Sequence, residues 1–131
     1  MRNILITAVV GASAAALIGA MAVAQTTPEV TVQATRAVTT KLVGRTSTGI
    51  PIEEVSLSYR VSAADLDLAS AAGAQQLEKR VNDAALAACK EIGRQYPTAT
   101  PSDSECAKAA AKQAMDKAHE LIHAASKAAA K

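Results

Sequence analysis

Two cysteines constrain the fold of this chain most strongly, because each lies in a helical pattern and only a short break separates the two patterns. Cys89 belongs to the segment 70–93, which we expect Gly93 and Pro97 to end by C-cap geometry and by exclusion. Cys106 falls in the first turn of the second helical segment, 103–129. An antiparallel helical hairpin brings such positions together near its turn, so we predict a disulfide-linked antiparallel helical hairpin.

The first 24 residues have the pattern of a secretory signal peptide. Arg2 precedes an uncharged apolar run that closes on Ala22-Val23-Ala24, which favours cleavage between Ala24 and Gln25. A retained membrane anchor is the alternative, since the run 4–24 could nearly span a bilayer. After cleavage we expect a periplasmic or secreted protein with no stable membrane insertion. Two cysteines in an exported chain favour one structural disulfide over a redox pair or half of a metal site.

Both helical segments show capping and periodicity signals. Ser70 is a plausible N-cap, and Ser102 with Glu105 forms a capping-box pattern. The first helix carries an apolar stripe at 3–4 spacing, formed by Leu77, Val81, Ala84, Ala85, Ala88 and Ile92. The second helix gathers Cys106, Ala110, Ala114, Ala118, Leu121, Ala125 and Ala128 on one side. Its opposite side gathers Lys108, Lys112, Asp116, His119, His123 and Lys127.

Strand patterns precede the helices. In the Thr-rich segment 25–50, "EVTVQATR" alternates Val30, Val32 and Ala34 with polar residues, and "TTKLVGRTSTG" is a weaker candidate for a short strand or a loop. "GIPIEEVSLSYRV" opens the segment 51–131 and places Val55, Leu57, Tyr59 and Val61 on one face. We therefore predict an α+β domain of two or three short antiparallel strands followed by the helical hairpin.

Composition excludes some partners. The chain has 14 Lys and Arg against 12 Asp and Glu, so no basic excess favours nucleic acid or an anionic membrane surface. It has no Phe and no Trp, and a small chain with so few aromatics is expected to build a thin core.

The segment "VSAADLDLASAAGAQQLEKRVNDAALAACKEIG", a spacer and "CAKAAAKQAM" together resemble the UrcA family of small exported bacterial proteins. That family's pattern has V-S-Y-x-D-L-D-L, then a Gly, a Leu-x-x-Arg-Val helix with one cysteine, and a second cysteine opening another helix. The match covers about residues 55–118, and Ala63 departs from it where the family usually has tyrosine. The matching positions are Val61, Ser62, Asp65, Leu66, Asp67, Leu68, Gly73, Leu77, Arg80, Val81, Cys89 and Cys106. The resemblance implies an exported, disulfide-bonded small domain, does not imply an activity, and leaves function open.

The segment "HELIH", residues 119–123, spells the zinc-protease signature of two histidines one helical turn apart with a glutamate between them. A catalytic zinc needs a third protein ligand, but no His, Asp or Glu follows His123. Lys108 and Lys112, on the same helix face, repel a cation. We therefore expect no catalytic residues, no cofactor and no metal site, and keep weak metal binding through His119, Glu120 and His123 as the alternative.

Asp65 and Asp67 alternate with Leu66 and Leu68, so an extended segment would direct both carboxylates to one side and both leucines inward. Such carboxylates at a strand-to-helix junction usually cap the helix, although they could also face a partner. The leading hypothesis is a non-enzymatic envelope protein that binds an unidentified protein partner. The strand edge near residues 55–61 is its expected docking site.

Overall fold

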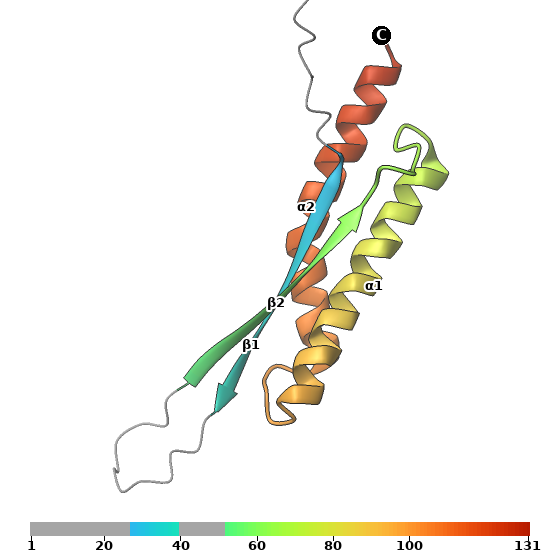
Figure 1. The fold of residues 1–131 in the computed structure, drawn as a ribbon. Coiled ribbons are helices and arrows are strands. Elements are labelled where there is room, and N and C mark those ends of the chain that lie inside the picture. Colours follow the sequence, from blue (N-terminus) through green and yellow to red (C-terminus); the bar gives the residue numbers. More distant parts are fainter. Residues whose placement is uncertain (1–26, 40–51) are drawn as a thin grey trace, which may run out of the picture.

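The computed structural model describes residues 27–39 and 52–131. A β-hairpin lies across a pair of helices in two layers (Figure 1). Its strands are β1 (Glu29–Thr39) and β2 (Ile52–Ser62), and its helices are α1 (Ala71–Gln95) and α2 (Asp103–Ala129). The α+β class and the disulfide-linked helical hairpin are thus confirmed. The expected signal peptide and the weaker strand candidate at 40–49 lie outside the described residues.

The two strands pair antiparallel in continuous register from Glu29 opposite Ser62 to Thr39 opposite Ile52. Val30, Val32 and Ala34 are fully buried, which confirms the alternation that predicted this strand. The same face continues to Arg36, whose side chain is also buried. β1 packs on both helices, whereas β2 packs on α1.

The helices begin where their caps predict. Ser70 accepts a hydrogen bond from the Gly73 amide, and Ser102 forms a complete capping box with Glu105. The expected stripe of α1 is buried except for half-buried Ala84, and Cys89 joins it. On α2 the stripe is buried from Cys106 to Ala118. Beyond that point Leu121 and Ala125 are only partly covered, and Ala128 is exposed because α2 extends past the rest of the core.

Gly93 does not end α1, as the sequence suggested; the helix continues to Gln95. The reason for glycine here is a close approach between elements rather than C-cap geometry. A Cβ atom on Gly93 would lie 2.5 Å from Asp103 Oδ1 and 2.7 Å from Arg36 Nη1. Gly93 therefore leaves room for a contact between β1, α1 and α2.

The junction between β2 and α1 also differs from expectation. Residues 63–70 form two successive turns rather than an extended segment, with backbone hydrogen bonds from Leu66 to Ala63 and from Ser70 to Asp67. Leu68 is buried and Leu66 half-buried, because turns can direct both leucines inward without the alternation of a strand. This compact junction reverses the chain and places α1 under β2.

Cys89 and Cys106 are bonded, with their Cα atoms 5.9 Å apart. The bond joins α1 to α2 next to the turn that connects them, as the positions of the cysteines predicted. A disulfide fits a protein of an oxidising compartment. No helix within the described residues is both long enough and apolar enough to cross a membrane.

Candidate functional site

The outer edge of β2 is the leading candidate for a docking site, because its backbone groups face away from β1. Just after β2, the Ala63 amide donates to the Pro28 carbonyl, so the peptide groups of odd-numbered residues face β1. On β1, Ala37 exchanges both hydrogen bonds with Thr100 on its outer side, which gives the same alternation independently. The outward-facing residues of β2 are therefore Glu54, Ser56, Ser58 and Arg60. No described residue outside the hairpin hydrogen-bonds to their backbone.

The outer edge of each strand is covered at one point by a residue from outside the hairpin. Arg80 from α1 donates through Nη1 to the Ser62 carbonyl at 3.0 Å, which covers the C-terminal end of the β2 edge. Thr100 from the α1–α2 turn covers β1 at Ala37. Within the described part of the chain, the stretch of β2 from Glu54 to Arg60 is open to pairing with a further strand.

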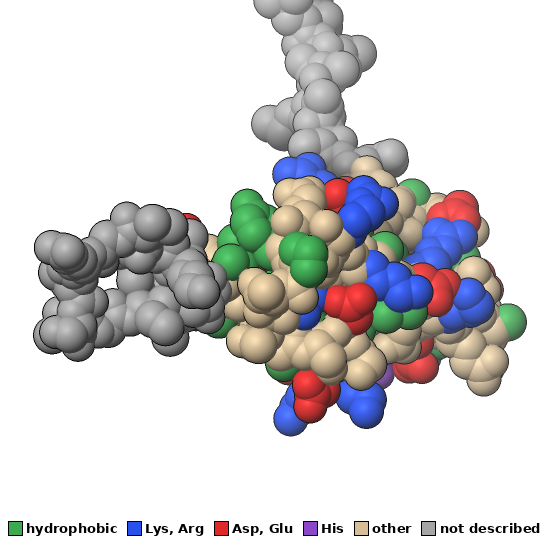
Figure 2. All heavy atoms as spheres, turned by 90° about the horizontal axis from the view of Figure 1, so that it is seen from below, with side chains coloured by type: hydrophobic (Ala, Val, Ile, Leu, Met, Phe, Trp, Pro, Cys, Tyr) green, Lys and Arg blue, Asp and Glu red, His purple; other side chains and the backbone are tan. Residues whose placement is uncertain are grey.

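The face of β2 that points toward the helices is incompletely covered. Val55 and Leu57 are half-buried and Tyr59 is 37% exposed, whereas their partners on β1 are buried. The sequence predicted that these side chains share one face, but it could not show that the helices cover β1 better than β2. Figure 2 shows charged side chains spread over much of one face of the domain, with a few hydrophobic side chains among them. An added strand would bring side chains that bury this apolar surface.

Asp65 and Asp67, singled out in the sequence, have separate structural contacts. Asp65 forms a bidentate ion pair with Arg80, with Nη1–Oδ1 at 2.7 Å and Nη2–Oδ2 at 2.6 Å. Hydrogen bonds from the Arg80 guanidinium lower the pKa of Asp65 to about 2. Asp67 accepts a hydrogen bond from the Ala69 amide and so stabilises the second turn. The structure does not bring the two carboxylates together as one site.

The Gly of the UrcA-like pattern is required by close backbone packing. A Cβ atom on Gly73 would lie 1.9 Å from the Asp67 carbonyl oxygen. That carbonyl accepts hydrogen bonds from the amide and the hydroxyl of Ser70, the N-cap of α1. Gly73 therefore allows the junction to fold back on the first turn of α1. With Asp65–Arg80 and the disulfide, most of the pattern corresponds to contacts that hold the junction and the hairpin together.

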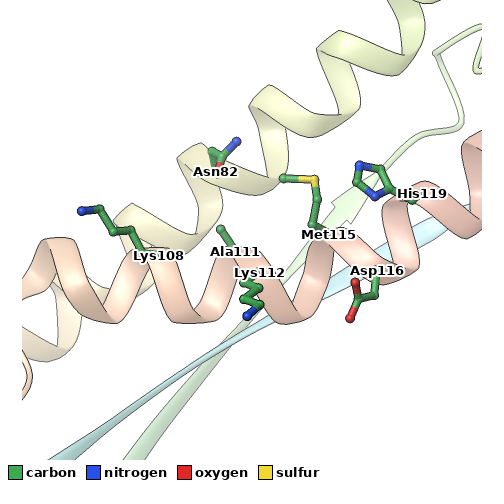
Figure 3. A pocket seen from close by; sticks show the side chains of 7 residues that line it. All are labelled: Asn82, Lys108, Ala111, Lys112, Met115, Asp116 and His119. Carbon is green, nitrogen blue, oxygen red and sulfur yellow. The ribbon is translucent and has the colours of Figure 1, made fainter.

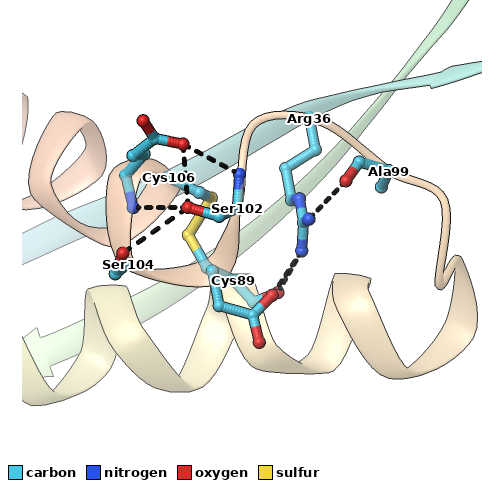
Figure 4. A network of polar contacts seen from close by, with 8 residues as sticks. Arg36, Cys89, Ala99, Ser102, Ser104 and Cys106 are labelled. Atoms are coloured by element: carbon cyan, nitrogen blue, oxygen red, sulfur yellow. Dashed lines mark hydrogen bonds and ion pairs between the residues drawn. A yellow bond between two sulfur atoms is a disulfide. The ribbon is translucent and has the colours of Figure 1, made fainter.

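A buried arginine that the sequence analysis did not single out organises the other end of the domain (Figure 4). Arg36 is 4% exposed and donates to the Cys89 carbonyl at 3.2 Å, to the Ala99 carbonyl at 2.5 Å and to Asp103 Oδ1 at 2.5 Å. These acceptors belong to α1, the connecting turn and α2. The signal was present in the alternation, since Arg36 continues the inward positions of Val32 and Ala34. Its role is to fix β1 against the turn beside the disulfide.

The two histidines and the glutamate of the "HELIH" segment are exposed on α2, whereas Leu121 and Ile122 are partly buried. From its position opposite the buried stripe, His119 was expected to face solvent alone. In the structure its Nε2 atom also contacts Glu78 Oε1 of the neighbouring helix α1, at 3.2 Å. Glu120 pairs with Lys117 and His123 is exposed. No three His, Cys, Asp or Glu side chains of ranges 27–39 and 52–131 are grouped to hold a metal ion.

His119 also borders a shallow groove of about 390 Å³ between the helices (Figure 3). Ala111 and Met115 supply its apolar part, and Asn82 lines it from α1. The remaining lining residues are charged: Lys108, Lys112 and Asp116. The groove is open to solvent, and its lining contains no serine, threonine or cysteine that could act as a nucleophile.

No family model, curated protein or solved structure matches the chain. The resemblance to the UrcA family therefore remains an interpretation of the sequence. Function has to be argued from the described surface itself.

Proposed function

We propose that this chain is an exported, non-enzymatic binding module of the bacterial envelope that docks a protein partner on the open edge of β2. The observation that carries the proposal is the run of peptide groups from Glu54 to Arg60, which no described residue outside the hairpin hydrogen-bonds, beside a half-covered apolar face. Main-chain hydrogen bonds from an added strand supply affinity, and alternate side chains supply specificity. The disulfide and the apolar N-terminal run support export.

The rest of the domain is built to hold this edge in place. The ion pair of Asp65 with Arg80 fixes the C-terminal end of β2, and buried Arg36 fixes the neighbouring strand at the opposite end. A two-stranded ribbon alone is marginally stable in water, so packing on the helices is what keeps its edge ordered. Because the backbone of this edge is already ordered, binding an extended segment costs little conformational entropy on the side of this domain.

The test compares Ser58→Pro with Ser58→Ala in protein expressed as the full chain and recovered from the periplasm. The Ser58 amide faces outward, so proline removes a donor that the β1–β2 ladder does not use, and the proline ring obstructs a new strand. Alanine keeps the amide. Proteins captured from envelope extract of the native host are identified by mass spectrometry, and the far-ultraviolet spectrum of each variant reports folding.

We expect the wild type and Ser58→Ala to capture the same protein and Ser58→Pro to lose it while remaining folded. Capture that survives Ser58→Pro would refute docking on this edge. The mass of the recovered chain tests the export proposal, with Gln25 expected as the first residue. Recovery of the chain with residues 1–24 still attached would contradict cleavage.

A further inference from the structure

We propose that the partner of the β2 edge is a second copy of this chain, paired strand to strand about a two-fold axis at Leu57. This inference rests on the proposed docking function and names the occupant of the same site. Antiparallel pairing of β2 with itself would join two hairpins into one four-stranded sheet with helices on one face. The evidence is the self-complementary order of side chains along the exposed strand.

The sequence from Glu54 to Arg60, E-V-S-L-S-Y-R, is complementary to itself when reversed. With Leu57 on the axis, Glu54 lies opposite Arg60, and Val55 lies opposite Tyr59 of the second copy. The two serines face each other, and Leu57 faces its own copy. Opposite charges and aromatic–β-branched pairs are the cross-strand combinations that stabilise antiparallel sheets. Arg60 is free to take this role, because its side chain is 79% exposed and its contact with Glu29 is long, at 3.6 Å.

The hydrogen-bonding pattern agrees with this register. The peptide groups of Glu54, Ser56, Ser58 and Arg60 face outward, and the register places these four residues opposite one another. Leu57 and the Val55–Tyr59 pairs then occupy non-hydrogen-bonded positions, where opposing side chains lie closest. Moving the axis to Ser56 or Ser58 keeps the hydrogen bonds but removes the pairing of Glu54 with Arg60. Charge complementarity therefore selects one register.

In the proposed dimer, apolar burial would add to the stabilisation that the backbone hydrogen bonds provide. Val55, Leu57 and Tyr59 point to the helix side of the sheet but are only partly covered in one copy. In the pair, the same three residues of the second copy lie against them. Small residues also line the flank of α1 near this edge: Ala84 and Ala87 follow Arg80 at helical spacing, and Arg80 itself reaches the edge at Ser62. In the proposed pair, this flank of α1 would face α1 of the second copy.

The experiment is sedimentation velocity over a concentration series with the chain recovered from the periplasm. We expect a concentration-dependent dimer. In Glu54→Arg, both symmetric ion pairs become repulsive, so the dissociation constant should rise about tenfold or more. Arg60→Glu should have the same effect. An equimolar mixture of the two variants should recover the dimer, since each copy then supplies the charge that the other lacks.

The mixture also excludes misfolding, because unfolded variants could not restore each other. A wild type that stays monomeric throughout would overturn the inference, as would a dimer that both charge reversals leave intact, or variants whose mixture fails to associate. The docking function and the identity of its partner can be tested independently of each other. If the chain is monomeric but capture of another protein is lost in Ser58→Pro, the docking edge stands and the second copy is excluded as its occupant.

Discussion

Gly73 offers the sharpest test of how the junction between β2 and α1 is built. In Gly73→Ala, the new Cβ would lie 1.9 Å from the Asp67 carbonyl oxygen and 2.6 Å from its carbon. Both are backbone atoms, so no side chain can rotate away to relieve the overlap. Asp67 or the first turn of α1 has to move, and either movement strains the hydrogen bonds that join Ser70 to Asp67 and to Gly73.

The expected loss combines three effects. Overpacking at a site that cannot relax costs about 1–3 kcal/mol. Weakening the Ser70 N-cap costs about 1 kcal/mol. Alanine recovers up to about 1 kcal/mol of helix propensity relative to glycine. We therefore expect Gly73→Ala to lower the free energy of unfolding by about 2 kcal/mol, which is a large share of the stability of a small domain.

Urea denaturation of the oxidised protein, followed by circular dichroism, measures this change. Gly93→Ala is a useful comparison, because its Cβ would meet the ends of the Asp103 and Arg36 side chains instead of backbone. Asp103 could turn toward solvent to relieve the overlap, but this would withdraw its carboxylate from buried Arg36, so we expect Gly93→Ala to be destabilised as well, by about 1–3 kcal/mol. The reasoning is refuted if Gly73→Ala is as stable as the wild type.

Three further predictions concern the disulfide, the ion pair and the histidines. Replacing Cys89 and Cys106 together by serine should lower the free energy of unfolding by about 3 kcal/mol in urea, because the bond closes a loop with a sequence separation of 17, and an unchanged midpoint would contradict this. The pKa of Asp65 is lowered from 3.8 to about 2 by Arg80, so its ion pair stabilises the fold fully above about pH 4 and is lost as the pH falls through about 2. The gap in melting temperature between wild type and Asp65→Asn should close over that range, and a gap that is constant with pH would count against the pair. Calorimetric titration with Zn²⁺ should show no micromolar site, whereas micromolar binding lost in His119→Ala would establish the metal-binding alternative.

The helices and their caps were predictable because their determinants are local. Ser102 and Glu105 are three residues apart, and the stripe from Leu77 to Ile92 follows the helical repeat, so short segments of sequence carry the information. The alternation in β1 is local in the same sense. The disulfide could be predicted because the chain has only two cysteines and both helices place them beside the same turn.

Gly93 and Asp67 show where local reasoning fails. Glycine near the end of a helical pattern suggests a C-cap, but Gly93 is needed because β1 and α2 approach it closely. The carboxylates at 65 and 67 looked like one pair on an extended segment, but turns separate them and direct one to Arg80. The contacts at Gly93 and the ion pair of Asp65 with Arg80, 15 positions away, join residues that are distant in the chain.

The sequence by itself determined which segments become strands and helices, where the helices begin and which cysteines join. Only the tertiary structure decided that Arg36 is buried beside Asp103, that Glu78 meets His119, and that β2 is less covered than β1. The partners in these two contacts lie 67 and 41 positions apart, respectively. Backbone periodicity and capping act over a few residues, whereas burial depends on how completed elements pack. The open edge of β2, the basis of both proposals, exists only at that second level.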